Sequence, residues 1–135
     1  MVSLIRQQGA AAVMVALLGG LSATALAATP AELLAGYSAE AGVRAEPARG
    51  QAFFTQRHGQ EWSCASCHTA QPTQAGKHAV TGKTIAPMAP AVNAQRFTDL
   101  AKTEKWFRRN CKDVVGRECQ ANEKADVLAW LMTLK

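Results

Sequence analysis

The chain has 135 residues, with 15 Lys and Arg against 10 Asp and Glu, and a formal net charge of +5. This length is that of one domain, and a hydrophobic fraction of 48% with 19% charged residues is typical of a globular protein rather than a disordered or collagen-like chain. The aromatic fraction is only 6%, so a core made of protein alone would be modest. The 4 cysteines could form two disulfides, form one metal site, or be divided between two tasks.

The first 27 residues have the pattern of a cleaved secretory signal peptide. Arg6 lies in a short polar start, an apolar run follows over 9–21, and a small-residue segment ends at Ala27. The apolar run is shorter than the roughly 20 residues that span a bilayer, so we expect cleavage and export to the periplasm rather than a membrane anchor. The mature domain, 28–135, would have 108 residues, no membrane span and a charge of +4, in a compartment where disulfides persist.

The mature chain is predicted to be all-α, because four segments have helical signals and none has the alternating pattern of a strand. The predicted helices cover residues 30–41, 47–58, 99–114 and 122–134. The first two begin with proline, which suits the first turn of a helix, and Thr98 is the expected N-cap of the third. The segment 63–97 is rich in Ser, Thr, Pro, Gly, Gln and Ala, and is expected to be irregular.

The helix predicted over 99–114 has two distinct faces at about 100° per residue. One face is mainly apolar and consists of Leu100, Thr103, Trp106, Phe107, Asn110, Cys111 and Val114. The opposite face is basic and consists of Lys102, Lys105, Arg108, Arg109 and Lys112. Two interpretations of the basic face stay open, a solvated surface or a docking site for an acidic redox partner. Nucleic-acid binding is not expected, because the charge is modest and no recognition motif is present.

The segment Cys64–His68 has the sequence CASCH, the C-x-x-C-H spacing of c-type haem attachment. Two thiols three positions apart can add to the two vinyl groups of one porphyrin, and the adjacent His68 can bind the iron. A thioredoxin-like pair is typical of a βαβ context, and a zinc site needs a second ligand pair. We therefore expect one haem c, attached through Cys64 and Cys67 and ligated by His68.

The other two cysteines, Cys111 and Cys119, are expected to form a disulfide in an exported protein. The bridge would close a short loop between the last two helices and contribute about 2–3 kcal/mol. It would also restrain Asn110, the residue before Cys111.

Two residues are the main candidates for the iron ligand opposite His68, and His78 is a further candidate that we expect instead to be an exposed loop residue. Met88 lies in a proline-containing loop, and a methionine ligand would give an iron closed to small molecules. Asn110 is a polar amide on an apolar helix face, which either needs a partner for structural reasons or serves as a ligand. The residue pattern alone does not choose between Met88 and Asn110.

Beyond these single motifs, three features together resemble a small class I cytochrome c. They are Gly50-x-x-x-Phe54, the C-x-x-C-H segment, and the last helix with Trp130. In that fold the N- and C-terminal helices cross beside one covalently bound haem, and the glycine allows their close approach. More narrowly, the tract 106–112 with Cys119 and the ending 127–131 is similar to the sphaeroides haem protein family, over essentially all of 30–135.

The resemblance implies roles for particular residues. In that family an asparagine before a disulfide cysteine ligates ferric haem and leaves on reduction; this favours Asn110 over Met88, with Cys111 and Cys119 as the disulfide. It implies a protein that accepts electrons from a dihaem cytochrome c and binds O2, NO or CO when reduced. The alternatives are an electron carrier ligated by His68 and Met88, and a haem enzyme that turns over O2 or NO.

Overall fold

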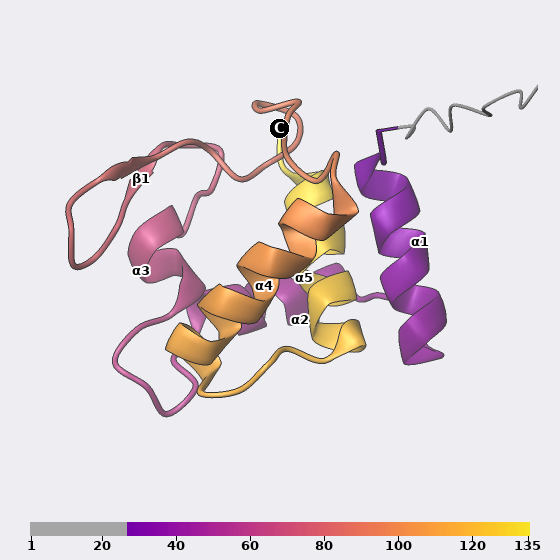
Figure 1. Ribbon diagram of the computed structural model, residues 1–135, viewed down its shortest axis with the longest axis horizontal. Helices are drawn as coiled ribbons and strands as arrows, with labels where there is room; N and C mark the ends of the chain where they lie inside the picture. Colours follow the sequence, from indigo (N-terminus) through magenta and orange to yellow (C-terminus); the bar gives the residue numbers. More distant parts are fainter. Residues whose placement is uncertain (1–26) are drawn as a thin grey trace, which may run out of the picture.

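The computed structural model describes residues 27–135, which form five helices and one pair of very short strands (Figure 1). The helices are α1 (Pro30–Ala41), α2 (Pro47–Thr55), α3 (Cys64–His68), α4 (Leu100–Val115) and α5 (Ala121–Thr133), and the strands are β1 (Gly76–Lys77) and β2 (Thr84–Ile85). The predicted signal peptide lies outside the described residues, except for Ala27. Within 27–135, every helix is too short or too polar to cross a membrane.

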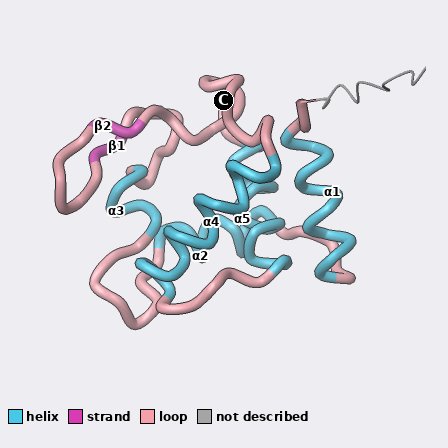
Figure 2. The backbone as a smooth tube through the Cα atoms, viewed as in Figure 1, coloured by secondary structure: helices cyan, strands magenta, loops and turns pink. Residues whose placement is uncertain are grey.

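All four predicted helices are present, with ends that differ from prediction by at most three residues. Between α3 and α4 the chain is mostly loop, as expected, but it also contains the antiparallel pair β1–β2 (Figure 2). The prediction that no strand forms is therefore wrong. The ladder pairs Gly76 with Ile85 and Lys77 with Thr84, and two residues per strand are too few to produce an alternating pattern.

The helix starts follow the capping chemistry of the sequence. At α1, Thr29 Oγ1 accepts from the Glu32 N–H at 3.2 Å, while the Thr29 N–H donates to Glu32 Oε2 at 2.7 Å. At α4 the cap is Asp99, whose carboxylate accepts from the Lys102 N–H at 2.9 Å, so the expectation of Thr98 is wrong. A carboxylate is favoured over a hydroxyl here by the positive end of the helix dipole, and Thr98 donates instead to the Gln95 carbonyl.

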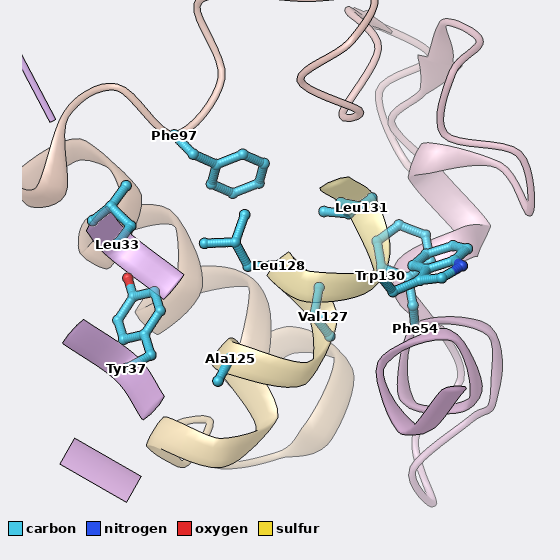
Figure 3. Packing of buried hydrophobic residues seen from close by; sticks show 9 residues of the cluster. All are labelled: Leu33, Tyr37, Phe54, Phe97, Ala125, Val127, Leu128, Trp130 and Leu131. Carbon is cyan, nitrogen blue, oxygen red and sulfur yellow. The ribbon is translucent and has the colours of Figure 1, made fainter. Parts of the chain in front are cut away.

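Helix α5 is the centre of the core and packs against both α1 and α2. Leu128 and Leu131 are fully buried on its inner face. The remaining members of the cluster come from α1, α2, α5 and the loop before α4 (Figure 3); they are Leu33, Tyr37, Phe54, Phe97, Ala125, Val127 and Trp130. This packing removes the nine side chains of the cluster from water.

Helix α2 crosses α5 at Gly50 with no room for a side chain. A Cβ at this position would overlap the carbonyl of Asp126 and lie 2.8 Å from the Val127 nitrogen. One turn later Phe54 packs on Trp130, with ring centroids 5.0 Å apart. The helix crossing implied by the cytochrome resemblance is therefore present. The helix that crosses the C-terminal helix α5 at a glycine is α2, which is the second helix of the described chain because α1 precedes it.

The same crossing contains a buried carboxylate. Asp126 is 4% exposed and accepts from the Glu46 N–H at 2.6 Å and from Arg49 Nε and Nη2 at 2.8 and 3.0 Å. A buried charge of this kind is tolerated because it is paired and hydrogen-bonded. Sequence reasoning did not single out Asp126, because its partners come from α2, about 80 residues earlier.

Helix α4 is held to the core by a few specific side-chain contacts. Lys124 Nζ of α5 donates to both carboxylate oxygens of Glu104, at 3.0 and 2.8 Å. Tyr37 of α1 meets Phe107 edge to face, with centroids 5.9 Å apart. These contacts turn the predicted apolar face of α4 inward.

Two members of that face are nonetheless exposed, and their predicted burial is wrong. Leu100 is 53% exposed and Trp106 is 44% exposed. Leu100 borders a hollow of about 410 Å³ between α1 and α4. The guanidinium carbon of Arg109 lies over the Trp106 ring, 5.7 Å from the centroid of that ring. Helical periodicity gives the direction in which a side chain points, but not how closely the helix approaches its neighbours.

Candidate functional site

Helix α3 presents both attachment cysteines within a little more than one helical turn. Its start is fixed by the Ser63 N–H, which donates to Ser66 Oγ at 3.0 Å. Because residues at i and i+3 lie on the same side of a helix, Cys64 and Cys67 face the same way. Both are half-buried and their thiols are free. The helix was missed in the sequence because five residues are too few to show a period.

The hairpin β1–β2 packs directly on α3 through Gly76. A Cβ on Gly76 would overlap the Cys67 carbonyl and lie 3.0 Å from the His68 Cα. Further along the hairpin, the Ala79 N–H points to Cys67 Sγ at 3.3 Å. The loop segment after α3 therefore supports the attachment turn, and Gly76 is a site residue that sequence reasoning did not identify.

His68 has the properties of a neutral iron ligand. Burial, with a smaller effect from the charge of Arg96, lowers the pKa of His68 to about 4, so the imidazole is uncharged at neutral pH. Its ring lies 6.2 Å from that of Phe54, and its Nδ1 is buried without a hydrogen-bond partner. The next residue, Thr69, has φ of 64° and ψ of 160°, a region that residues other than glycine rarely adopt.

The thiol chemistry disfavours a redox or zinc function for the same cysteines. Burial raises the pKa of Cys64 to about 11, whereas disulfide exchange requires a thiolate. The remaining cysteines are not available as a second ligand pair, because Cys111 and Cys119 are joined as a disulfide with Cα atoms 5.6 Å apart. Within 27–135, three or more His, Cys, Asp or Glu side chains nowhere gather as a metal cluster.

Asn110 lies within α4, one residue before the disulfide. It is half-buried and five residues from the last helical residue, so it does not cap the helix, whose C-cap is Gly116. The side-chain hydrogen bonds formed within 27–135 do not include its amide. Asn110 therefore has no evident task in holding the described part of the chain together.

Met88 lies in a loop that is fixed from several directions. Its N–H donates to the Pro72 carbonyl at 2.8 Å, and the carbonyl of Pro87 accepts from Asn93 Nδ2 at 3.0 Å. Its side chain is partly buried against the core cluster, as are those of Cys64 and Phe107. The core cluster is thus the common neighbour of the attachment turn, the Met88 loop and α4.

The other two histidines are engaged in local structure. His58 Nε2 lies 2.8 Å from the Phe53 carbonyl oxygen, and the two rings are 4.3 Å apart. His78 Nδ1 accepts from the backbone N–H groups of Val80 and Thr81 at 3.3 and 3.2 Å. Among the three histidines of residues 27–135, His68 is therefore the one with a buried ring nitrogen that has no hydrogen-bond partner.

Comparison with known proteins identifies relatives over most of the described chain. A family described as "Domain of unknown function (DUF1924)" matches residues 40–131. Cytochrome c-type protein SHP of Cereibacter sphaeroides is 52% identical over an alignment of 107 residues, with coverage of 76% of this chain and 82% of that protein. Cytochrome c'' of Methylophilus methylotrophus is 47% identical over an alignment of 88 residues, with coverage of 62% of this chain and 61% of that protein.

Solved structures of the same two proteins share the fold. The structure of oxidised SHP is described as an oxygen-binding cytochrome c. It matches with a TM-score of 0.75 at 49% identity, and the match covers 79% of this chain and 98% of the SHP chain. Oxidised cytochrome c'' has a TM-score of 0.71 at 38% identity and covers 78% and 94% of the two chains.

The crossed helices and the attachment turn define a monohaem c-type cytochrome of class I-like fold. Its donor set fits one haem c, since Cys64 and Cys67 are free and face the same way beside a neutral His68. The chain belongs to the sphaeroides haem protein (SHP) family. The fold class and the cofactor predicted from the sequence are both confirmed.

Proposed function

We propose that this protein is a periplasmic cytochrome that accepts an electron and then binds a small ligand, O2, NO or CO, in place of Asn110. The haem supplies the redox centre and the coordination position. His68 would bind the iron in both oxidation states, and the Asn110 amide oxygen would bind it only in the oxidised state. The proposal takes oxygen binding from the description of the SHP structure.

The observation that carries the proposal is the unassigned amide of Asn110. A polar amide on the inward face of a helix needs an explanation when it neither caps the helix nor bonds another group. Asn110 is half-buried on the same face as the core-packed Phe107, and it neither caps α4 nor bonds within 27–135. An iron ligand would account for an amide at this position.

Coordination chemistry supplies the redox dependence. Carboxylate and carbonyl oxygens are hard donors, which bind the more highly charged ferric ion better than the softer ferrous ion. Reduction would therefore weaken the Asn110 bond and leave the distal position open. The disulfide between Cys111 and Cys119 restrains the backbone beside Asn110, so release would occur mainly by movement of the side chain.

Met88 supports a competing function, simple electron transfer with a permanently closed iron. Its loop is well fixed and its side chain is partly buried, as a methionine ligand would require. The two functions make opposite predictions for two variants that each remove one candidate ligand, Asn110→Ala and Met88→Leu.

The decisive variant experiment compares the oxidised forms of these two proteins. With Asn110→Ala we expect an altered ferric spectrum and cyanide binding to the oxidised protein that is faster by about tenfold or more, because a competing bond worth about 1.4 kcal/mol gives that factor. Met88→Leu should leave the ferric spectrum and cyanide kinetics close to wild type. An unchanged Asn110→Ala protein together with an altered Met88→Leu protein would overturn the assignment of Asn110.

We also propose that the electron donor is a dihaem cytochrome c that docks on the basic face of α4. Arg108 and Lys112 lie 3.9 and 3.3 Å from Glu118, which partly neutralises them. The other members of this face, Lys102, Lys105 and Arg109, are exposed and form no ion pair within 27–135. This face belongs to the helix that carries Asn110, and docking to an acidic surface would weaken as ionic strength rises.

A further inference from the structure

Arg96 is a half-buried cation that has no carboxylate partner within 27–135. Its Nε donates to the Pro87 carbonyl at 2.9 Å and its Nη2 to the Ala86 carbonyl at 2.6 Å. Two other arginines of residues 27–135 have carboxylate partners, Arg49 with Asp126 at 2.8 Å and Arg117 with Glu123 at 2.6 Å, whereas Arg44, Arg57 and Arg109 are exposed to solvent. The backbone carbonyls satisfy two N–H groups of Arg96 but leave its charge uncompensated.

A charge in this condition is unusual because burial penalises it. The lost solvation lowers the pKa of Arg96, yet a guanidinium remains protonated in proteins. Two of its five N–H groups donate to the carbonyls of Pro87 and Ala86, and the remaining donors retain the fork geometry that matches a carboxylate. Arg96 can therefore bind an anion, and no carboxylate of residues 27–135 fills that role.

The backbone places Arg96 beside the haem-attachment turn. Gly76 packs against Cys67 and His68, and Gly76 pairs in the hairpin with Ile85. Ile85 is followed by Ala86, whose carbonyl binds the Arg96 guanidinium. The electrostatic effect of Arg96 on His68 agrees with this placement.

We infer that Arg96 binds one of the two propionate carboxylates of the haem. The cofactor brings these anions to the site that Cys64, Cys67 and His68 define, and Arg96 offers an oriented cation there. The pairing keeps that propionate ionised over the neutral pH range, and the positive charge disfavours the oxidised iron and raises the reduction potential. The inference rests on the haem and not on the distal role of Asn110.

The test measures the reduction potential from pH 5 to 8 in holoprotein carrying Arg96→Gln, Arg96→Lys or Arg44→Gln. Arg44 is exposed in the α1–α2 loop and provides a control of equal charge change. Arg96→Gln should lower the potential. It should also add a pH dependence in which the potential falls as pH rises, because the unpaired propionate now titrates in this range and binds its proton more tightly when the iron is reduced. Arg44→Gln should change neither.

Arg96→Lys keeps the positive charge but loses the bidentate geometry of the guanidinium. It therefore still tests the contact with the propionate if the Arg96→Gln variant forms little holoprotein. We expect it to retain most of the potential and to shift the propionate bending band in the resonance Raman spectrum. If Arg96 only pins the loop at Ala86 and Pro87, both variants would lower thermal stability while the Raman band and the pH profile of the potential stay as in wild type. That result would overturn the inference, whatever ligand Asn110 proves to be.

Discussion

The part of the molecule formed by α1, α2 and α5 and the part formed by residues 63–97 with α4 are held together by different means. In the first, long helices with recognisable starts bury a continuous apolar cluster, and the buried Asp126 ties α2 to α5. In the second, a five-residue helix and a two-residue ladder are positioned by close backbone contact and single hydrogen bonds. The first part contains most of the buried apolar cluster, and the second contains the attachment cysteines, the ligand histidine and the candidate distal ligands.

This division has a physical reason. A haem-binding chain must leave apolar surface and donor groups facing the cofactor, so the residues around it cannot all be packed on one another. The difference between the two parts predicts that substitutions in the first reduce global stability, while matched substitutions in the second reduce cofactor attachment.

The largest effect is expected for Gly50→Ala, at the crossing of α2 and α5. The added Cβ would overlap backbone atoms of Asp126, which cannot move without displacing α5, and overpacking of this kind costs about 3 kcal/mol. Denaturant unfolding of the holoprotein, followed by circular dichroism, measures the change. Gly36→Ala in α1 is the control, because its Cβ meets nothing within 4 Å and alanine should be neutral or stabilising. Equal stabilities of the two variants would contradict the proposed crossing.

A smaller effect on stability is expected for Gly76→Ala, in the hairpin against α3. Its Cβ would overlap the Cys67 carbonyl, but the hairpin can shift away from α3, so we expect about 1–2 kcal/mol. The main consequence should be a lower fraction of chains carrying covalent haem, measured by intact-mass spectrometry. The neighbouring Lys77→Ala is exposed and should attach haem normally. Full attachment in Gly76→Ala would show that the hairpin does not position the cysteines.

The smallest effect is expected for reversal of charge on the basic face of α4. Lys102→Glu with Lys105→Glu should slow reduction by a dihaem cytochrome c several-fold at low ionic strength, and the difference should disappear as salt screens the charges. Stopped-flow kinetics over a salt series provide the measurement, and Arg44→Glu with Arg57→Glu, both exposed, provide the matched control. Equal rates for the two double variants would favour a merely solvated face.

The difference between the two parts also explains what the sequence could predict. Prolines, caps and apolar periodicity located α1, α2, α4 and α5, because these signals act within one helix. The C-x-x-C-H segment identified the cofactor, because covalent chemistry fixes that spacing.

The residues that sequence reasoning missed act across the fold. Gly76, Arg96 and Asp126 have roles that depend on partners at least eight positions away, and the exposure of Trp106 depends on the separation between helices. A pattern along the chain contains no information on such distances.

Whether reduction opens the iron is decided by absorption spectra of the wild-type protein in the oxidised state, the reduced state and the reduced state under CO. We expect an oxidised spectrum without a methionine–iron charge-transfer band and a reduced spectrum that changes on addition of CO. A methionine–iron band in the oxidised protein, together with a reduced spectrum that CO leaves unchanged, would contradict this expectation and assign the distal position to Met88.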